Sequence, residues 1–154
     1  MDYLLSAADY SKLHLEILLF IGIFEFVISD GKFREKIEKS LLICWIYLVL
    51  AMTILSRDPY EGIHFDFIPF WKRGYFSVEN RLNIFLLMPI GFLLPMLKKK
   101  WWQVFLIGLF CTLSIETLQY ITKTGWFDIN DIMFNELGII IGWGIYKIIF
   151  LIRK

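Results

Sequence analysis

Acidic and amide side chains are concentrated in one stretch near the C-terminus of a chain that is otherwise strongly apolar. Glu116 and Gln119 lie at the end of one hydrophobic segment, and Asp128, Asp131 and Asn135 lie at the start of the next. A charged side chain within lipid costs at least ~2.5 kcal/mol unless it is paired or faces water, so such residues are functional candidates. Carboxylates and amides at this spacing could bind a polar head group, transfer protons or ligate a hard cation.

The residue types and their spacing do not decide between these roles. In an enzyme, Glu116 or Asp131 would be the general base, and Asn or Arg groups would stabilise developing negative charge. In a cation site, the carboxylates and Asn135 would supply the oxygen ligands that Ca²⁺ and Mg²⁺ prefer, although the spacing is not that of a dedicated calcium loop. We expect no metal and no other cofactor, with Ca²⁺ or Mg²⁺ as the weaker alternative. A purely structural network that fixes helix tilt is a further alternative.

The overall composition is that of an integral membrane protein. Of 154 residues, 58% are hydrophobic and 18% aromatic, and the mean hydropathy is +0.62. This length allows a single membrane domain over residues 1–154. Lys and Arg lie between the apolar blocks and form no basic face, so we expect no nucleic acid partner. Cys44 and Cys111 lie within apolar runs and are expected to be small buried hydrophobes.

Apolar segments of sufficient length predict the helices that position these side chains. They cover residues 13–29, 41–55, 82–97, 101–122 and about 128–152. The first is the weakest, because Glu16 and Glu25 interrupt it and its length is near the minimum for crossing the hydrocarbon core. A charged connection at 29–40 follows it, and an aromatic-rich connection at 56–79 is expected at the lipid interface. We predict an all-α, polytopic transmembrane helix bundle of about five membrane helices, or four if the first segment does not span.

The distribution of Lys and Arg predicts how the bundle is oriented. Five spans place the connection at 29–40, the turn at 98–100 and the C-terminus on one side of the membrane. That side carries ten basic residues and the other side carries six. Because basic residues are enriched in cytoplasmic loops, the C-terminus is predicted to be cytoplasmic and the acidic stretch to face outward.

Helical spacing gathers the polar side chains into stripes, because residues three, four and seven apart share one face. Three helices carry a stripe that is polar at its outer end: Asn80, Asn83, Leu87 and Gly91; then Gly108, Thr112, Glu116, Gln119 and Lys123; then Asp128, Asp131, Asn135, Gly138 and Gly142. The pair Gly138 and Gly142 would let another helix approach closely. Pro89 is expected to kink the third span. With Arg57 from the aromatic-rich connection, the stripes predict an outward-opening polar pocket.

Two segments of the chain resemble the VanZ-like family of small bacterial membrane proteins. They are NIFLLMPIGFLLPML from Asn83 and SIETLQYITKTGWFDINDIMFNELGIIIGW from Ser114, and FIPF at 67–70 resembles a third family block. The resemblance covers residues 57–143. Its motif positions are Asn83, Pro89, Gly91, Glu116, Gln119, Asp128, Asp131, Asn135 and Gly138. Asp66 stands where the family tends to have Asn, and Lys123 is the basic residue nearest to the Phe127–Asp128 pair.

The resemblance implies a multi-pass protein of the bacterial plasma membrane with a role in the cell envelope. The eponymous family member is associated with resistance to the glycopeptide antibiotic teicoplanin. Membrane lipids are the expected partners, together with a lipid-linked cell-wall intermediate or a glycopeptide. The candidate ligand-binding residues are Arg57, Asn80, Asn83, Glu116, Gln119, Lys123, Asp128, Asp131 and Asn135. A membrane-embedded enzyme that acts on an envelope lipid through Glu116 and Asp131 is the alternative.

Overall fold

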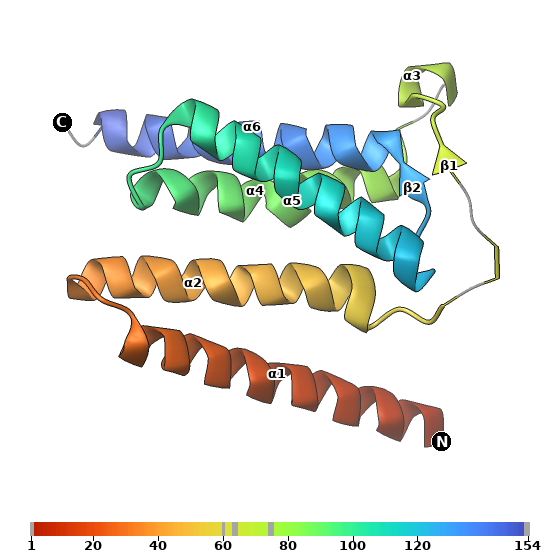
Figure 1. Ribbon diagram of the computed structural model, residues 1–154, viewed down its shortest axis with the longest axis horizontal. Helices are drawn as coiled ribbons and strands as arrows, with labels where there is room; N and C mark the ends of the chain where they lie inside the picture. Colours follow the sequence, from red (N-terminus) through yellow and green to blue (C-terminus); the bar gives the residue numbers. More distant parts are fainter. Residues whose placement is uncertain (1, 60, 63–64, 74–75, 153–154) are drawn as a thin grey trace.

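The computed structural model describes residues 2–59, 61–62, 65–73 and 76–152, and it is an all-α protein (Figure 1). Tyr60, Tyr75, Arg153 and Lys154 lie outside the described residues. The helices are α1 (Asp2–Ile28), α2 (Phe33–Leu50), α3 (Phe70–Arg73), α4 (Val78–Met96), α5 (Trp101–Thr122) and α6 (Ile129–Ile152). A π-helical turn, η1 (Ala51–Leu55), extends α2, and two short strands are β1 (Phe65–Asp66) and β2 (Phe127–Asp128). The all-α part of the predicted fold class is therefore confirmed.

Within the described residues, three helical segments are long and apolar enough to cross a membrane. They are Phe33–Leu55, Trp101–Thr122 and Ile129–Phe150. The helices α1 and α4 are not among them in the part of the chain that was searched. A helical membrane protein is thus supported, and the number of five spans stays a prediction.

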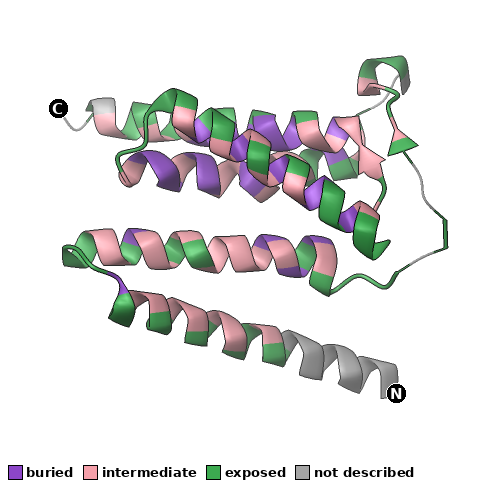
Figure 2. Cartoon of the chain, in the orientation of Figure 1, coloured by how far each residue is buried: buried purple, intermediate pink, exposed green. Residues whose placement is uncertain are grey.

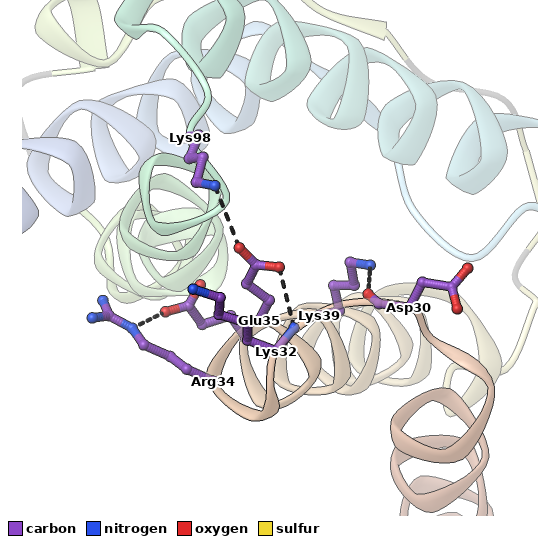
Figure 3. Close-up of polar contacts among 7 residues, drawn as sticks. Asp30, Lys32, Arg34, Glu35, Lys39 and Lys98 are labelled. Atoms are coloured by element: carbon purple, nitrogen blue, oxygen red, sulfur yellow. Dashed lines mark hydrogen bonds and ion pairs between the residues drawn. The ribbon is translucent and has the colours of Figure 1, made fainter.

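The helix α2 begins at Phe33, so the charged connection expected at 29–40 is mostly helical. Lys, Arg and Glu are good helix formers, and their spacing here allows pairs within one helix. The Arg34 Nε atom donates to Oε1 of Glu38 at 2.6 Å, one turn further on. The Lys32 backbone N–H donates to Oε2 of Glu35 at 3.4 Å, at the start of the helix (Figure 3). The predicted start of this helix at residue 41 was wrong, because only apolar residues were used to place it.

The closest contact in the bundle joins α4 to α6. A methyl group added to Gly138 would overlap the carbonyl oxygen of Ile84, and one added to Gly142 would overlap that of Met88. From the other side, a methyl group on Gly91 would overlap the carbonyl oxygen of Ile139. The two backbones therefore touch with no side-chain layer between them, as small residues permit in membrane helices.

Pro89 lies within α4, which continues through it as a single helix. A proline leaves the carbonyl four residues earlier without its helical donor, which here is that of Phe85. In the neighbouring helix α2, the Trp45 Nε1 atom donates to the Leu86 carbonyl oxygen at 2.8 Å. The polar backbone of the proline-containing turn thus gains a donor from another helix, as a helix in lipid requires.

Burial follows the pattern of a membrane bundle. Buried residues concentrate where α4, α5 and α6 face one another, as Figure 2 shows. Large apolar side chains are exposed on the outer faces, including Phe20 at 68% and Phe110 at 73% exposed. The helix α1 lies along α2, apart from the three central helices (Figure 1). Exposed apolar surface on this scale would be unstable in water and is expected next to lipid.

Candidate functional site

The polar residues meet at the end of the bundle where α5 turns into α6. The site begins with Glu116, whose side chain is buried within α5 with 1% exposure. The backbone N–H of Asp128 in β2 donates to Oε2 of Glu116 at 3.0 Å. This bond links the turn between the two helices to the Glu116 carboxyl group.

Asp128 caps the first turn of α6. Its Oδ1 atom accepts hydrogen bonds from the Asn130 backbone N–H at 2.7 Å and from Asn130 Nδ2 at 2.8 Å. A side-chain oxygen at this position satisfies one of the backbone donors that every helix leaves free at its N-terminus. The negative charge is also favoured there by the helix dipole.

Asp131 completes a group that we call the acid cluster: Glu116, Asp128 and Asp131. Each of the three interacts electrostatically with the others, and Arg57 interacts with both Glu116 and Asp131. Arg57 forms no ion pair within 4.0 Å in the described part of the chain; its Nε atom donates to the Met52 carbonyl oxygen at 3.2 Å. Arg57 therefore acts on the acid cluster through longer-range electrostatic attraction and not through a direct ion pair.

Gln119 connects the acid end of α5 to the end of α2. Its Nε2 atom donates to the Thr53 carbonyl oxygen at 3.1 Å, and both residues are buried. Thr53 lies in the π-helical turn η1, where the last carbonyl groups lack helical donors. Gln119 and Arg57 thus satisfy two adjacent carbonyl oxygens, those of Thr53 and Met52, at the end of one membrane segment.

Two amides beside the acid cluster have groups left without a hydrogen bond. Asn135 Nδ2 donates to Thr112 Oγ1 at 3.0 Å, while Asn135 Oδ1 is buried and has no partner among the described residues. Asn83 Nδ2 is also buried without a hydrogen bond, although the side chain lies near Asp131. Buried amide groups are normally satisfied, so an unsatisfied pair near a polar cluster indicates space for a water molecule or a ligand group.

Two further candidate residues, Asn80 and Lys123, make no hydrogen bond or ion pair with the acid cluster in the described part of the chain. Asn80 is buried at the start of α4, where its backbone N–H donates to the capping Ser77 Oγ at 3.1 Å. Lys123 is exposed and ends α5 in the left-handed region at φ 59°. Its side chain makes no ion pair with a described residue, so the structure leaves Lys123 apart from the acid cluster.

Asn130 is a site residue that sequence reasoning missed. It is 1% exposed, its Oδ1 accepts from the Phe70 backbone N–H at 2.7 Å, and its Nδ2 donates to the Ile68 carbonyl oxygen at 2.9 Å. Asn130 thereby joins the aromatic-rich connection to the start of α6. It lies off the stripe of Asp128 and Asp131, and the signal that could have found it is an Asn two residues after a helix-capping Asp.

The aromatic-rich connection lies over the turn between α5 and α6. Strand β1 pairs in parallel with β2, with Phe65 opposite Phe127 and Asp66 opposite Asp128. The Phe65 ring centroid lies 4.8 Å from that of Tyr120 and 5.9 Å from that of Phe127. These rings form an aromatic surface beside the acid cluster, whereas the sequence favoured anchoring of the connection to lipid over a role in ligand binding.

Glu136 is the second buried polar residue that the helical stripes did not predict. It is 9% exposed on α6, and both of its carboxyl oxygens are buried without a hydrogen bond from any described residue. A methyl group on Gly108 of α5 would lie 3.0 Å from Glu136 Oε2. A lone Glu inside an apolar helix was itself the signal, because such a residue is costly in lipid.

The arrangement of the acidic side chains bears on whether the site could bind a metal ion. Among the residues that the structure describes, no group of three or more His, Cys, Asp or Glu side chains is arranged to hold a metal ion. The carboxyl groups of the acid cluster are hard oxygen donors. Each has a separate place, however: Asp128 caps α6, Glu116 accepts from the backbone of the turn, and Asp131 interacts with both electrostatically.

Fold and site together define a helical membrane protein with an acid cluster at one end of its central helices. A family model described as VanZ/LLP1 matches residues 40–151, which is most of the chain. The protein belongs to this VanZ-like family, and the resemblance seen in the sequence is confirmed. No curated protein and no solved structure matches the chain.

Proposed function

We propose that this protein binds the polar head group of a lipid or of a lipid-linked cell-wall intermediate at the acid cluster. The observation that carries the proposal is the gathering of three carboxyl groups at one end of the bundle. Glu116, Asp128 and Asp131 lie in mutual electrostatic range, and Arg57 is the cation that acts on two of them. Ionisable groups in a membrane span are costly and are retained mainly for function.

The chemistry of the acid cluster favours a ligand rich in hydrogen-bond donors. The carboxyl groups offer oxygen atoms that accept hydrogen bonds, and the Asn135 Oδ1 atom nearby is a further buried acceptor without a partner among the described residues. Sugar hydroxyl groups, peptide amides and ammonium groups are the matching donors. The aromatic surface of Phe65, Phe127 and Tyr120 offers ring faces for sugar or peptide groups. Apolar outer faces of the helices would hold the lipid tail.

The acid cluster would face outward in the bacterial plasma membrane, with the C-terminus in the cytoplasm. The excess of basic residues on the opposite side supports this orientation. A reporter enzyme that is active only in the cytoplasm, fused after the last residue, is expected to be active. Activity of a reporter that works only outside the membrane would overturn the orientation.

Family membership supports a contribution to resistance against lipid-anchored glycopeptides such as teicoplanin. We expect expression in a susceptible bacterium to raise the inhibitory concentration of teicoplanin. Glu116→Gln and Asp131→Asn should abolish the increase while the amount of protein in the membrane is unchanged. Glu16→Gln, at an exposed position on α1, is the matched control and should retain it. Full resistance in both cluster variants would reduce the acid cluster to a structural role.

Catalysis is the second candidate, and the electrostatic interaction between the two shielded carboxyl groups of Glu116 and Asp131 favours it. Glu116 is fully buried and Asp131 is half-buried, and one could donate a proton while the other accepts one. Native mass spectrometry of the protein purified from membranes separates the two functions. A retained, unaltered lipid or lipid-linked sugar supports binding, whereas a chemically altered lipid after incubation supports an enzyme.

A further inference from the structure

We propose a second ligand site, at the other end of the bundle, for the phosphate-bearing head group of an anionic membrane phospholipid. A cavity of about 520 Å³ lies where α4, the α4–α5 turn and α6 meet. We call it the basic pocket; its lining includes Lys98, Lys99, Lys100, Lys147, Trp143 and Tyr146. It is separated from the acid cluster by most of α5, whose 22 residues extend roughly 33 Å.

The charge of the basic pocket has one sign. None of its lining residues is acidic. Lys98 is the lysine already engaged, because its Nζ atom lies 3.4 Å from Oε1 of Glu35 across the gap to α2 (Figure 3). Lys99, Lys100 and Lys147 have no carboxylate partner within the described residues. Ammonium groups converging on a cavity without a counter-charge favour an anionic ligand.

Local backbone geometry holds these lysines together. The helix α4 ends at Met96, Lys98 adopts the left-handed conformation at φ 61°, and α5 begins at Trp101. This tight turn places three consecutive lysines beside the first turn of α5, where the helix dipole adds positive potential. Lys147 reaches the same place from α6, with its Nζ atom 5.5 Å from the centre of the Trp143 ring.

The aromatic residues indicate a lipid head group. Trp101 and Trp102 are 66% and 46% exposed beside the basic pocket. Trp and Tyr prefer the head-group level of a bilayer, so the cavity is expected to lie at that level. Lysines in this position attract anionic lipids. A cavity of about 520 Å³ is also far larger than a single phosphate ion and can hold a phosphate together with its glycerol group.

The test compares phospholipids that differ in charge. Purified protein in detergent is titrated with phosphatidylglycerol or with zwitterionic phosphatidylcholine, and bound lipid is counted by native mass spectrometry. We expect tighter binding of phosphatidylglycerol, and a loss of about tenfold or more in the variant Lys99→Gln/Lys100→Gln/Lys147→Gln. Circular dichroism and gel filtration would establish that the variant is folded. If it is not recovered, Lys100→Gln and Lys147→Gln singly should each weaken binding several-fold.

A matched control removes the same charge from the same end of the protein. Lys32→Gln/Lys36→Gln/Lys39→Gln alters the start of α2, outside the basic pocket, and should change phosphatidylglycerol binding by less than twofold. Equal losses in both triple variants, or equal binding of the two lipids, would overturn the proposal. Displacement of phosphatidylglycerol by millimolar inorganic phosphate would identify a free anion, not a lipid, as the occupant. None of these outcomes depends on the acid cluster or on resistance.

Discussion

Oε2 of Glu116 accepts a hydrogen bond of 3.0 Å from the backbone N–H of Asp128, so a side chain on α5 fixes the start of the segment that leads into α6. The donor belongs to the backbone, so every substitution of Asp128 except proline leaves it in place. The role of Glu116 in folding can therefore be separated from its charge by the choice of replacement.

Glu116→Gln keeps a side-chain oxygen that can accept from the Asp128 N–H, and Glu116→Ala does not. We expect the Gln variant to unfold near the wild-type temperature. The free energy of unfolding of the Ala variant should fall by about 1–3 kcal/mol, because a buried donor is left without a partner. Thermal unfolding in detergent, followed by tryptophan fluorescence, measures the difference. Equal stability of the two variants would show that the hydrogen bond contributes little.

Asn130→Ala should release the aromatic-rich connection from α6. It removes the acceptor for Phe70 N–H and the donor to the Ile68 carbonyl oxygen, with an expected cost of about 1–3 kcal/mol. Limited proteolysis should cut faster between residues 56 and 77. Ser114→Ala is a suitable control, since Ser114 bonds only its own helix through the Phe110 carbonyl oxygen. An unchanged cleavage rate in Asn130→Ala would mean that other contacts hold the connection.

The glycines of α6 provide a matched test of the contact with α4. Gly138→Ala and Gly142→Ala each drive a methyl group into a carbonyl oxygen of α4, so we expect each to destabilise the protein by at least ~2 kcal/mol. Gly144→Ala meets no atom within 4 Å and should be neutral or stabilising by up to ~1 kcal/mol. Melting temperatures of the three variants in the same detergent test this expectation. Similar values for all three would contradict the observed contact.

Glu136→Met should leave stability unchanged or raise it by up to about 3 kcal/mol. Both carboxyl oxygens are buried without a hydrogen bond among the described residues, and replacing an unsatisfied polar group by an apolar one of similar size removes its desolvation cost. Denaturation in detergent is again the measurement. A clear loss of stability would instead show that Glu136 has a bound partner, such as a water molecule or an ion, in the folded protein.

The sequence predicted the fold class and the family because both depend on patterns along the chain. Apolar segments identified the central helices, and the order of Glu116, Gln119, Asp128 and Asn135 identified the family. Helical spacing also put Glu116 and Gln119 on one face, and both are buried. The spacing rule could not find Asn130, which bonds a segment some 60 residues away, since long-range contacts leave no local pattern.

The start of α2 shows a different limit of sequence reasoning. A helix that projects beyond the hydrocarbon core can begin with charged residues, and there its limits are set by pairs such as Arg34 and Glu38. Hydropathy reports the part of a helix that lies in lipid and carries no information about the part outside it. The acidic residues of the acid cluster, by contrast, were visible in the sequence because they interrupt apolar runs.

The backbone contact between α4 and α6 also determines the order in which the protein can assemble. These helices are not consecutive, because α5 lies between them in the chain. During synthesis, Gly91 and the carbonyl oxygens of Ile84 and Met88 on α4 therefore lack this partner until α6 is made. The tightest contact between helices therefore forms only after α6 has been synthesised, and a chain that stops before α6 cannot form it.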